Sequence, residues 1–302
     1  MIYSRKTKVP VLLIIYNRPQ YTKKILKSIN KYGPSILYIA ADGWKDKEDR
    51  YKCLSARNQT NHFKWGCPIE TVFRKKNLGC GKAVSKAITW FFKNNTKGII
   101  LEDDCLPNED FYYYCDQMLN RYEYNGKIMH ISGVNYLPNK LKKRNGYYFS
   151  KMTHVWGWAT WRRAWRKYDY KMTRWGTSIT KNTFSNNYDV LHERNYWSSI
   201  FDIVKKRKID TWDYQWLYSC WVNEGLSINP GVNLVKNIGI EKDGTHTKNK
   251  INGIENKLEK FSFPLKNPSV VARDINKDRY VIENIFRPKF YSSLYLKIRY
   301  FL

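Results

Sequence analysis

The sequence lacks the patterns that mark several common protein classes. It contains no run of about 18 apolar residues, the length that a transmembrane helix needs. Its six cysteines form no Cys-x-x-Cys pair and have no histidine at the spacing of a zinc site. The P-loop and Gly-x-Gly-x-x-Gly patterns are absent as well. These absences argue against a membrane-spanning protein, a zinc or disulfide framework, a P-loop NTPase and a Rossmann dehydrogenase.

Acidic residues are also scarce. The chain has 26 Asp and Glu against 54 Lys and Arg, which gives a formal net charge of +28. Because 42% of the residues are hydrophobic, the chain can still build a core and is no disordered polycation. The positive charge predicts a polyanionic partner, such as anionic lipid, a phosphorylated substrate or nucleic acid. The basic residues are scattered, without a recognisable DNA- or RNA-binding module, so we expect no nucleic-acid partner.

The cellular location is predicted from the same absences. The apolar run 9–15 is too short for a signal peptide and lacks a small-residue cleavage site, so we expect no signal peptide. The cysteines are interpreted as reduced thiols. We therefore predict a cytoplasmic protein, with peripheral attachment to the inner face of the cell membrane as a further option.

Short apolar runs alternate with amphipathic segments over the first hundred residues. Helical spacing appears at 21–29 and 82–93. This alternation predicts an α/β fold with a mostly parallel central sheet flanked by helices. Turn residues then fall at the carboxyl edge of the sheet, among them Asn17, Asp42 and Asn77. The expected strands are 9–15, 36–40, 70–73 and 99–101.

The strand expected at 99–101 ends in three consecutive carboxylates, Glu102, Asp103 and Asp104. Such acids repel one another unless a cation or a hydrogen-bond network offsets the repulsion. One strand end offers a Mn²⁺ or Mg²⁺ ion only one or two ligands, so phosphate and water would complete its shell. This interpretation predicts a nucleotide diphosphate as partner. The alternative is a solvated acidic turn, such as a helix N-terminus built from Asp103, Asp104 and Pro107. An N-capped helix start is expected at Asn108.

Two glycines, Gly79 and Gly81, precede Lys82. They allow backbone amides to approach a phosphate, although Gly-x-Gly is more often a plain turn.

The second half of the chain is rich in tryptophan. Nine of the twelve tryptophans lie between Trp156 and Trp221. We expect Trp158 and Trp161 to be partly structural, and a minority of the rings to lie near the surface or to line a cleft.

Beyond Gly244 the chain turns polar, and irregular structure is expected until residues 286–302 recover helical spacing. Phe290, Leu294, Ile298 and Leu302 fall on one line of that segment. It is either a packing helix or an interfacial helix that lies on an anionic membrane.

An ordered series of short motifs resembles the GT-A fold glycosyltransferases. The closest resemblance is to the inverting N-acetylglucosaminyltransferase I type and related bacterial, family 2-like enzymes. The motifs extend from residue 8 to about residue 248. They are Asn17-Arg18-Pro19, Asp42-Gly43, Ile100 to Phe111, Ile128 to Asn135, Val155 to Ala159, Thr211 to Trp216, and Gly244 to Thr247.

The resemblance implies a role for each matching residue. Asp104 would ligate Mn²⁺ or Mg²⁺ on a UDP-sugar, with His246 near the metal and the diphosphate; the alternative for His246 is a surface-loop histidine. Other residues would bind the donor, and Asp213 would be the catalytic base. Trp156 and Trp212 would contact the acceptor. The donor-binding set is Asn17, Arg18, Asp42, Lys82, Glu102 and Asp103.

The sequence departs from the family at the base. The family has an acidic pair after a tryptophan, whereas here the single Asp213 is followed by Tyr214. Asp210 therefore stays open as an alternative base. Inversion needs one carboxylate to take the acceptor proton while a metal stabilises the leaving diphosphate.

The predicted function is metal-dependent, inverting transfer of a sugar, such as N-acetylglucosamine or another hexose, from a UDP-sugar. The acceptor would be a hydroxyl of a surface glycan, glycolipid or lipid-linked acceptor, with an anionic membrane surface as a further partner. Residues 1–248 would form the enzyme domain, divided into a donor half (1–127) and an acceptor and catalytic half (128–248). Residues 249–302 would be a basic extension. The alternatives are a non-enzymatic nucleic-acid-binding protein and a sugar-nucleotide nucleotidyltransferase.

Overall fold

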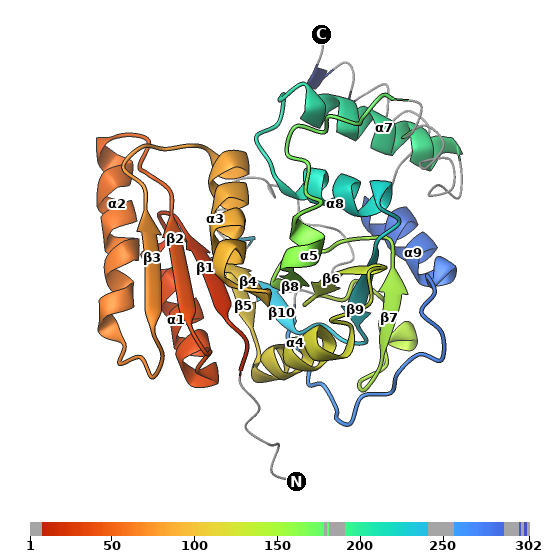
Figure 1. Cartoon of the computed structure of the whole chain (residues 1–302), viewed down its shortest axis with the longest axis horizontal. Coiled ribbons are helices and arrows are strands. Elements are labelled where there is room, and N and C mark those ends of the chain that lie inside the picture. Colours follow the sequence, from red (N-terminus) through yellow and green to blue (C-terminus); the bar gives the residue numbers. More distant parts are fainter. Residues whose placement is uncertain are drawn as a thin grey trace.

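The computed structural model describes residues 8–177, 180, 191–240, 257–286, 296 and 299–300. In this part of the chain an eight-stranded sheet runs through the molecule, with helices on both of its faces (Figure 1). The predicted fold class, a mostly parallel α/β sheet flanked by helices, is confirmed.

The first four strands of the large sheet are parallel and follow the order β3-β2-β1-β4. Every residue of β1 is buried, because helices cover both faces of a parallel sheet. The next four strands are mixed, in the order β8-β6-β9-β7, and β8 and β7 run against the others. The strands are β1 (Val11–Ile15), β2 (Leu37–Ala41), β3 (Ile69–Phe73), β4 (Lys97–Glu102), β6 (Ile128–Ser132), β7 (Tyr147–Ser150), β8 (Trp158–Trp161) and β9 (Leu226–Pro230). A separate pair joins β5 (Cys105–Pro107) to β10 (Val235–Asn237).

Two buried clusters cover the faces of the sheet. One contains α1 (Pro19–Tyr32) and α4 (Glu109–Arg121) with alternate residues of β1. The other contains α3 (Cys80–Asn94), α5 (Arg162–Trp165) and α8 (Asp213–Val222). Farther out, α7 (Leu191–Lys205) packs on α8 (Figure 1). The remaining elements are α2 (Lys47–Asn58), α9 (Ile275–Val281) and the short turns at Gln59–His62, Asn139–Leu141 and Ile282–Phe286.

The local predictions agree with these elements. Helices predicted at 21–29 and 82–93 form the cores of α1 and α3, and all four predicted strands are present. The predicted helix start at Asn108 is confirmed, because its side chain accepts a hydrogen bond of 3.0 Å from the Phe111 N–H as an N-cap. The sequence analysis did not predict α2, whose buried residues are only Asp49, Cys53 and Ala56.

All six cysteines are free thiols. Within the described residues, no helix is both long enough and apolar enough to cross a bilayer. Most of the predicted helix at 286–302 lies outside the described residues.

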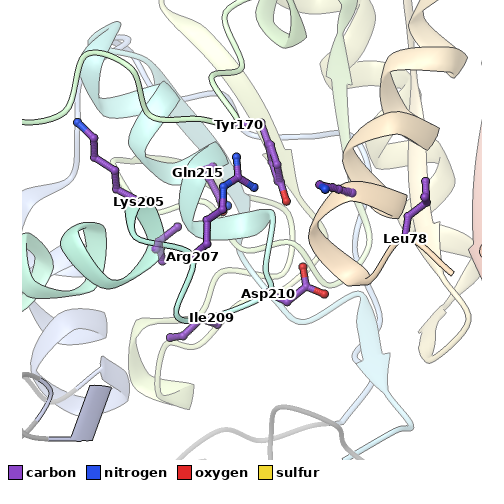
Figure 2. A pocket seen from close by; sticks show the side chains of 9 residues that line it. Leu78, Tyr170, Lys205, Arg207, Ile209, Asp210 and Gln215 are labelled. Atoms are coloured by element: carbon purple, nitrogen blue, oxygen red, sulfur yellow. The ribbon is translucent and has the colours of Figure 1, made fainter. Parts of the chain in front are cut away.

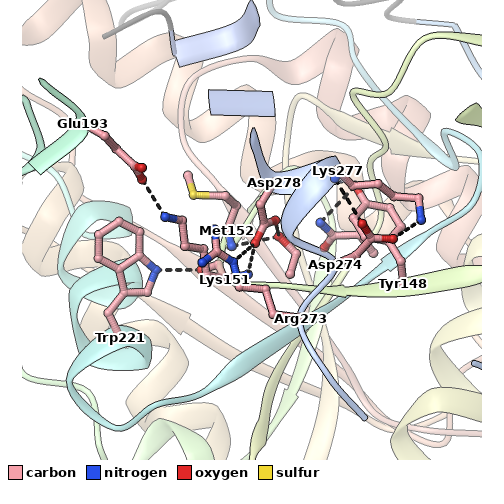
Figure 3. A network of polar contacts seen from close by, with 11 residues as sticks. Tyr148, Lys151, Met152, Glu193, Trp221, Arg273, Asp274, Lys277 and Asp278 are labelled. Carbon is pink, nitrogen blue, oxygen red and sulfur yellow. Dashed lines mark hydrogen bonds and ion pairs between the residues drawn. The ribbon is translucent and has the colours of Figure 1, made fainter. Parts of the chain in front are cut away.

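The segment 257–286 packs against the second half of the sheet. It forms bridges to Gly146 and Phe149 and then enters α9 and the turn Ile282–Phe286. Asp278 of α9 accepts hydrogen bonds from the Ser150 hydroxyl and from the Lys151 N–H, and it pairs with Arg273 at 2.6 Å (Figure 3). Burial raises the pKa of Asp278, and the nearby Arg273 guanidinium opposes that shift. These bonds tie α9 to the end of the edge strand β7.

A buried ion pair lies beside this network. The Lys151 ammonium contacts the Glu193 carboxylate at 2.6 Å, and both side chains are almost completely buried (Figure 3). The Lys151 carbonyl accepts a hydrogen bond of 2.7 Å from the Trp221 indole. The buried ion pair therefore joins the end of β7 to α7, and the hydrogen bond from Trp221 joins it to α8.

In the second half of the sheet, His130 of β6 is fully buried and stacks on Trp158 with ring centroids 5.1 Å apart. Its Nδ1 accepts a hydrogen bond of 3.1 Å from the Trp216 indole, so its Nε2 carries the proton and donates to the His154 carbonyl at 3.0 Å. Burial lowers the pKa of His130 to about 3. The fold therefore uses the neutral imidazole as a core side chain.

Replacing Glu193 by alanine leaves the Lys151 charge buried without its carboxylate. We expect a loss of about 3–5 kcal/mol in the free energy of unfolding, measured by urea titration. Glu48→Ala is the matched control, because Glu48 and Lys52 form an exposed pair whose loss leaves stability nearly unchanged. Equal losses in the two variants would contradict a stabilising role for the buried pair.

His130 predicts how stability depends on pH. Between pH 6.5 and about 3 the unfolded chain takes up a proton at this histidine that the folded chain does not, so stability falls as pH falls. We expect His130→Gln to remove about 1.4 kcal/mol per pH unit from that slope. Urea unfolding of both proteins at several pH values between 7.5 and 4.5 measures it. Parallel stability curves would show that the pKa of His130 is the same in the folded and the unfolded chain.

Candidate active site

Carboxylates gather where β1, β2 and β4 end. Because these strands are parallel, the residues that follow them meet at one edge of the sheet. At this edge the Arg18 guanidinium pairs with Asp103 at 3.2 Å and with Asp104 at 3.0 Å. The structure therefore joins the predicted residues from the ends of β1 and β4.

Asp103 is the most buried member of the acidic run. Besides its pair with Arg18, it accepts a hydrogen bond of 3.0 Å from the Tyr16 N–H. Burial raises its pKa, and the neighbouring Asp104 carboxylate raises it further, while Arg18 opposes both effects. Asp103 therefore holds the loops after β1 and β4 together.

Glu102 ends β4, and its side chain makes no hydrogen bond or ion pair with another described residue. Burial raises its pKa well above the ordinary value, and the carboxylates of Asp104 and Asp103 add to the shift. Asp213 adds a smaller contribution, and the Arg18 guanidinium opposes the shift without reversing it. This carboxyl group is half-buried and close to other acids, which is the kind of environment that functional acids occupy.

Asp104 is more accessible than Asp103, with 19% of its side chain exposed. The segment after β10 passes beside it, since the Ile238 N–H donates to the Asp104 carbonyl at 2.8 Å. A Cβ at Gly239 would lie 2.7 Å from the Asp104 Oδ2, so only glycine fits there without displacement. Gly239 is a site residue that the sequence analysis missed, because no local motif connects it to β4.

The predicted donor residues Asn17 and Asp42 lie on the adjoining loops. Asp42 accepts hydrogen bonds from the backbone N–H groups of Leu78 and Gly79, at 2.8 and 3.2 Å, while its Oδ1 is buried without a described partner. The Asn17 amide donates to Asp49 at 2.6 Å. Asp49, which the sequence analysis missed, also accepts a hydrogen bond from the Tyr16 hydroxyl. These contacts fix the loops after β1 and β2.

The two candidate bases come from the segment that leads into α8. Asp213 begins the helix, and its Oδ1 accepts hydrogen bonds from the Thr211 hydroxyl and from the Tyr214 N–H at 2.9 Å. No described residue donates a hydrogen bond to its Oδ2. Asp210 is instead held by the Gly81 N–H at 2.9 Å.

Cys80 lies among these acids. Burial raises the pKa of its thiol, and four carboxylates raise it further, so all four are close to one side chain. They are Glu102, Asp213, Asp210 and Asp104. The fold thus brings residues more than a hundred positions apart into one site. Cys80 has no motif of its own, and the sequence analysis did not select it.

The predicted metal site stays a prediction. Among the described residues, no group of three or more His, Cys, Asp or Glu side chains could hold a metal ion. His246, the other predicted ligand, lies outside the described residues. The half-buried Glu102 and the accessible Asp104 supply hard oxygen donors, which suit Mn²⁺ or Mg²⁺ when phosphate and water complete the shell.

The two predicted acceptor tryptophans differ in burial. Trp212 is only 3% exposed and stacks on Trp158 at 5.6 Å, so its ring contributes to the core and leaves little surface for a ligand. Trp156 is half-buried and lies edge-on to Tyr136 at 5.9 Å. A role for Trp156 in acceptor binding stays a prediction. Trp158 and Trp161 are buried, which confirms their structural role.

A pocket adjoins the acidic cluster. It has a volume of about 220 Å³ and lies between the start of α3 and the segment that joins α7 to α8 (Figure 2). Lys82, a predicted donor-binding residue, lines it together with Asp210. The remaining lining residues are Leu78, Tyr170, Val204, Lys205, Arg207, Ile209 and Gln215.

Comparisons with known proteins give fold-level similarities. No protein-family model matches the chain, and a search of curated proteins finds no match. A structure of S. aureus TarS 1–349 is 11% identical, with a TM-score of 0.42, covering 76% of this chain and 59% of that one. This chain thus spans about three fifths of the TarS fragment.

Two further solved structures are more distant. Mouse xyloside xylosyltransferase 1 is 10% identical, with a TM-score of 0.32, covering 70% of this chain and 81% of that one. A 4-diphosphocytidyl-2C-methyl-D-erythritol synthase from Anaerococcus prevotii is 9% identical, with a TM-score of 0.34, covering 65% and 83%. At TM-scores this low, nothing about activity follows, and the site is interpreted from its own geometry.

Proposed function

We propose that this protein is a metal-dependent, inverting glycosyltransferase of the GT-A type, which moves a sugar from a UDP-sugar to an acceptor hydroxyl. One observation carries the proposal. The Asp213 carboxylate, from the second half of the chain, is near enough to Glu102 at the end of β4 to raise its pKa, and Asp213, Glu102 and Asp104 all raise the pKa of the Cys80 thiol. A carboxylate cluster with a separate, oriented carboxylate beside it supplies the two functions that inverting transfer needs: support for the leaving diphosphate, and a base.

The donor would bind along the carboxyl edge of the sheet. In this proposal Arg18, Asn17 and Asp42 hold the nucleotide, and Glu102 and Asp103 contact the sugar or the ribose. The contacts described above support these roles, because each loop is fixed before any ligand arrives. Such preorganisation reduces the cost of ordering side chains on binding.

Asp104 is the proposed metal ligand, with His246 as the second. The bound cation would supply Lewis-acid stabilisation of the negative charge on the leaving diphosphate. Arg18 lies 3.0 Å from the Asp104 carboxylate, and its positive charge would also face that diphosphate.

Asp213 is the proposed base. Its Oδ1 is held by Thr211 and by the Tyr214 N–H, while its Oδ2 accepts no hydrogen bond from a described residue. In a single displacement, the acceptor oxygen would bond to the anomeric carbon and its proton would pass to Asp213. The bond from carbon to diphosphate would break, and the leaving oxygen would take that electron pair. Asp213 is preferred over Asp210, because the Asp213 carboxylate is among the groups that contribute most to the pKa of Glu102.

Removing the metal ligand tests the donor half. We expect the protein to hydrolyse at least one donor of a UDP-sugar panel in the presence of Mn²⁺, and we expect Asp104→Asn to slow this reaction about 100-fold or more. Glu109→Gln, an exposed carboxylate outside the cluster, serves as the control and keeps the wild-type rate. Failure of every nucleotide-sugar to bind, measured by calorimetry, would overturn the proposed function.

The identity of the base is tested separately. We expect Asp213→Asn to lower kcat by about 10²–10⁴ and to leave the Kd for UDP unchanged, because the base acts only in the reaction step. Asp210→Asn is the comparison, with a much smaller effect on kcat. If Asp210→Asn has the larger effect, the assignment of the base is wrong and the two residues exchange roles.

A further inference from the structure

The pocket of Figure 2 carries basic groups beside a single carboxylate. Lys82 and Arg207 line it, and Asp210 is the only carboxylate among its lining residues. Lys82, which also belongs to the predicted donor-binding set, and Arg207 form no ion pair with any described residue. Lys205 lines the pocket as well, but its side chain points away from Asp210 and its ammonium donates to the Trp175 carbonyl. Two cations near one carboxylate attract an anionic ligand, and guanidinium and ammonium groups are common phosphate binders.

An unpaired buried oxygen gives a second, independent sign of a ligand. Gln215 is only 4% exposed, and its Nε2 donates to the Thr211 carbonyl at 2.7 Å. This bond fixes the orientation of the amide, and the Oε1 is then buried with no hydrogen-bond partner in the described structure. A buried acceptor without a donor is costly, and a ligand hydroxyl in the pocket would pair with it.

The backbone at Arg207 supports the same conclusion. Arg207 follows α7 with φ at +56°, and the hydrogen bonds from the Arg207 and Lys208 N–H groups to Val204 and Ile203 form a Schellman turn. Glycine is the common residue at this position, because side chains disfavour positive φ. The arginine is therefore unfavourable for the turn, and its guanidinium lies 4.9 Å from the Tyr170 ring centre at the pocket.

The pocket is also continuous with the proposed reaction site. Asp210 lines it and is bonded to the Gly81 N–H. A Cβ at Gly79 or Gly81 would collide with the Asp210 carboxylate, so the glycines allow this close approach. Asp210 and Asp213 both lie near Cys80. A ligand in the pocket would therefore lie next to the candidate base.

We propose that this pocket binds a phosphate ester carrying free hydroxyls, which forms part of the acceptor. Lys82 and Arg207 would hold the phosphate, and the Gln215 Oε1 would accept a hydrogen bond from a hydroxyl. The proposal rests on the proposed function, because it names the acceptor chemistry of that same site. The phosphate ester belongs either to a phosphate-containing glycan or to a lipid headgroup.

The test uses glycerol 3-phosphate as the probe, with the full chain saturated by UDP and Mn²⁺ so that the donor site is filled. Calorimetry is expected to detect binding of glycerol 3-phosphate and weaker binding of inorganic phosphate, and no binding of glycerol. Arg207→Gly is expected to weaken the binding at least fivefold, while the melting temperature stays unchanged or rises. Lys86→Gln, on the exposed side of α3 one turn after Lys82, is the matched control and binds as the wild type does.

The outcomes separate the two proposals. If UDP does not bind, the proposed function fails; if UDP binds and glycerol 3-phosphate does not, only the phosphate pocket is overturned. Equal binding by the wild type and Arg207→Gly also overturns the pocket. Binding to vesicles of phosphatidylglycerol, compared with vesicles of phosphatidylcholine, identifies the source of the phosphate. If Arg207→Gly abolishes binding to the phosphatidylglycerol vesicles, the phosphate ester is a lipid headgroup. If the variant retains that vesicle binding, the phosphate ester belongs to a glycan.

Discussion

The guanidinium of Arg18 lies between the carboxylates of Asp103 and Asp104, and the carboxyl edge of the sheet depends on this contact. Several acids meet at this edge, and burial makes their mutual repulsion expensive. Arg18 offsets part of that cost, and it also connects the loop after β1 to the end of β4. The remaining repulsion is greatest at Glu102, whose side chain makes no hydrogen bond or ion pair with a described residue. The edge is therefore prepared for a cation or for the donors of a ligand.

A layer of aromatic side chains positions the other half of the site. Trp158 of β8 contacts Trp212, Trp216 and His130, and this packing fixes the start of α8 against the sheet. Asp213 begins that helix, so its position depends on a core that is distant from the acidic run in sequence. Part of the chain's excess positive charge lies in the pocket beside α3, on basic side chains that line it.

Local patterns were sufficient to predict most of the fold. The apolar runs predicted the four parallel strands, and the apolar periodicity of α1 and α3 predicted both helices. The end of β4 in three carboxylates pointed to the edge where Arg18, Asp42 and Asp104 meet. Sequence patterns missed α2, because its buried stripe is short and includes Asp49. They also left Trp212 with two interpretations, since periodicity does not distinguish a core ring from one in a cleft.

The sequence by itself determined the α/β class, the first four strands and the acidic edge, because apolar runs and helical periodicity are visible in short segments of the chain. Only the tertiary structure brought Asp213 to Glu102, placed Gly239 beside Asp104 and assembled the pocket around Gln215. These contacts join segments that are far apart in sequence, and no local pattern encodes the distance between them. They follow from the packing of two aromatic and aliphatic layers on one sheet, which exists only once the chain has folded.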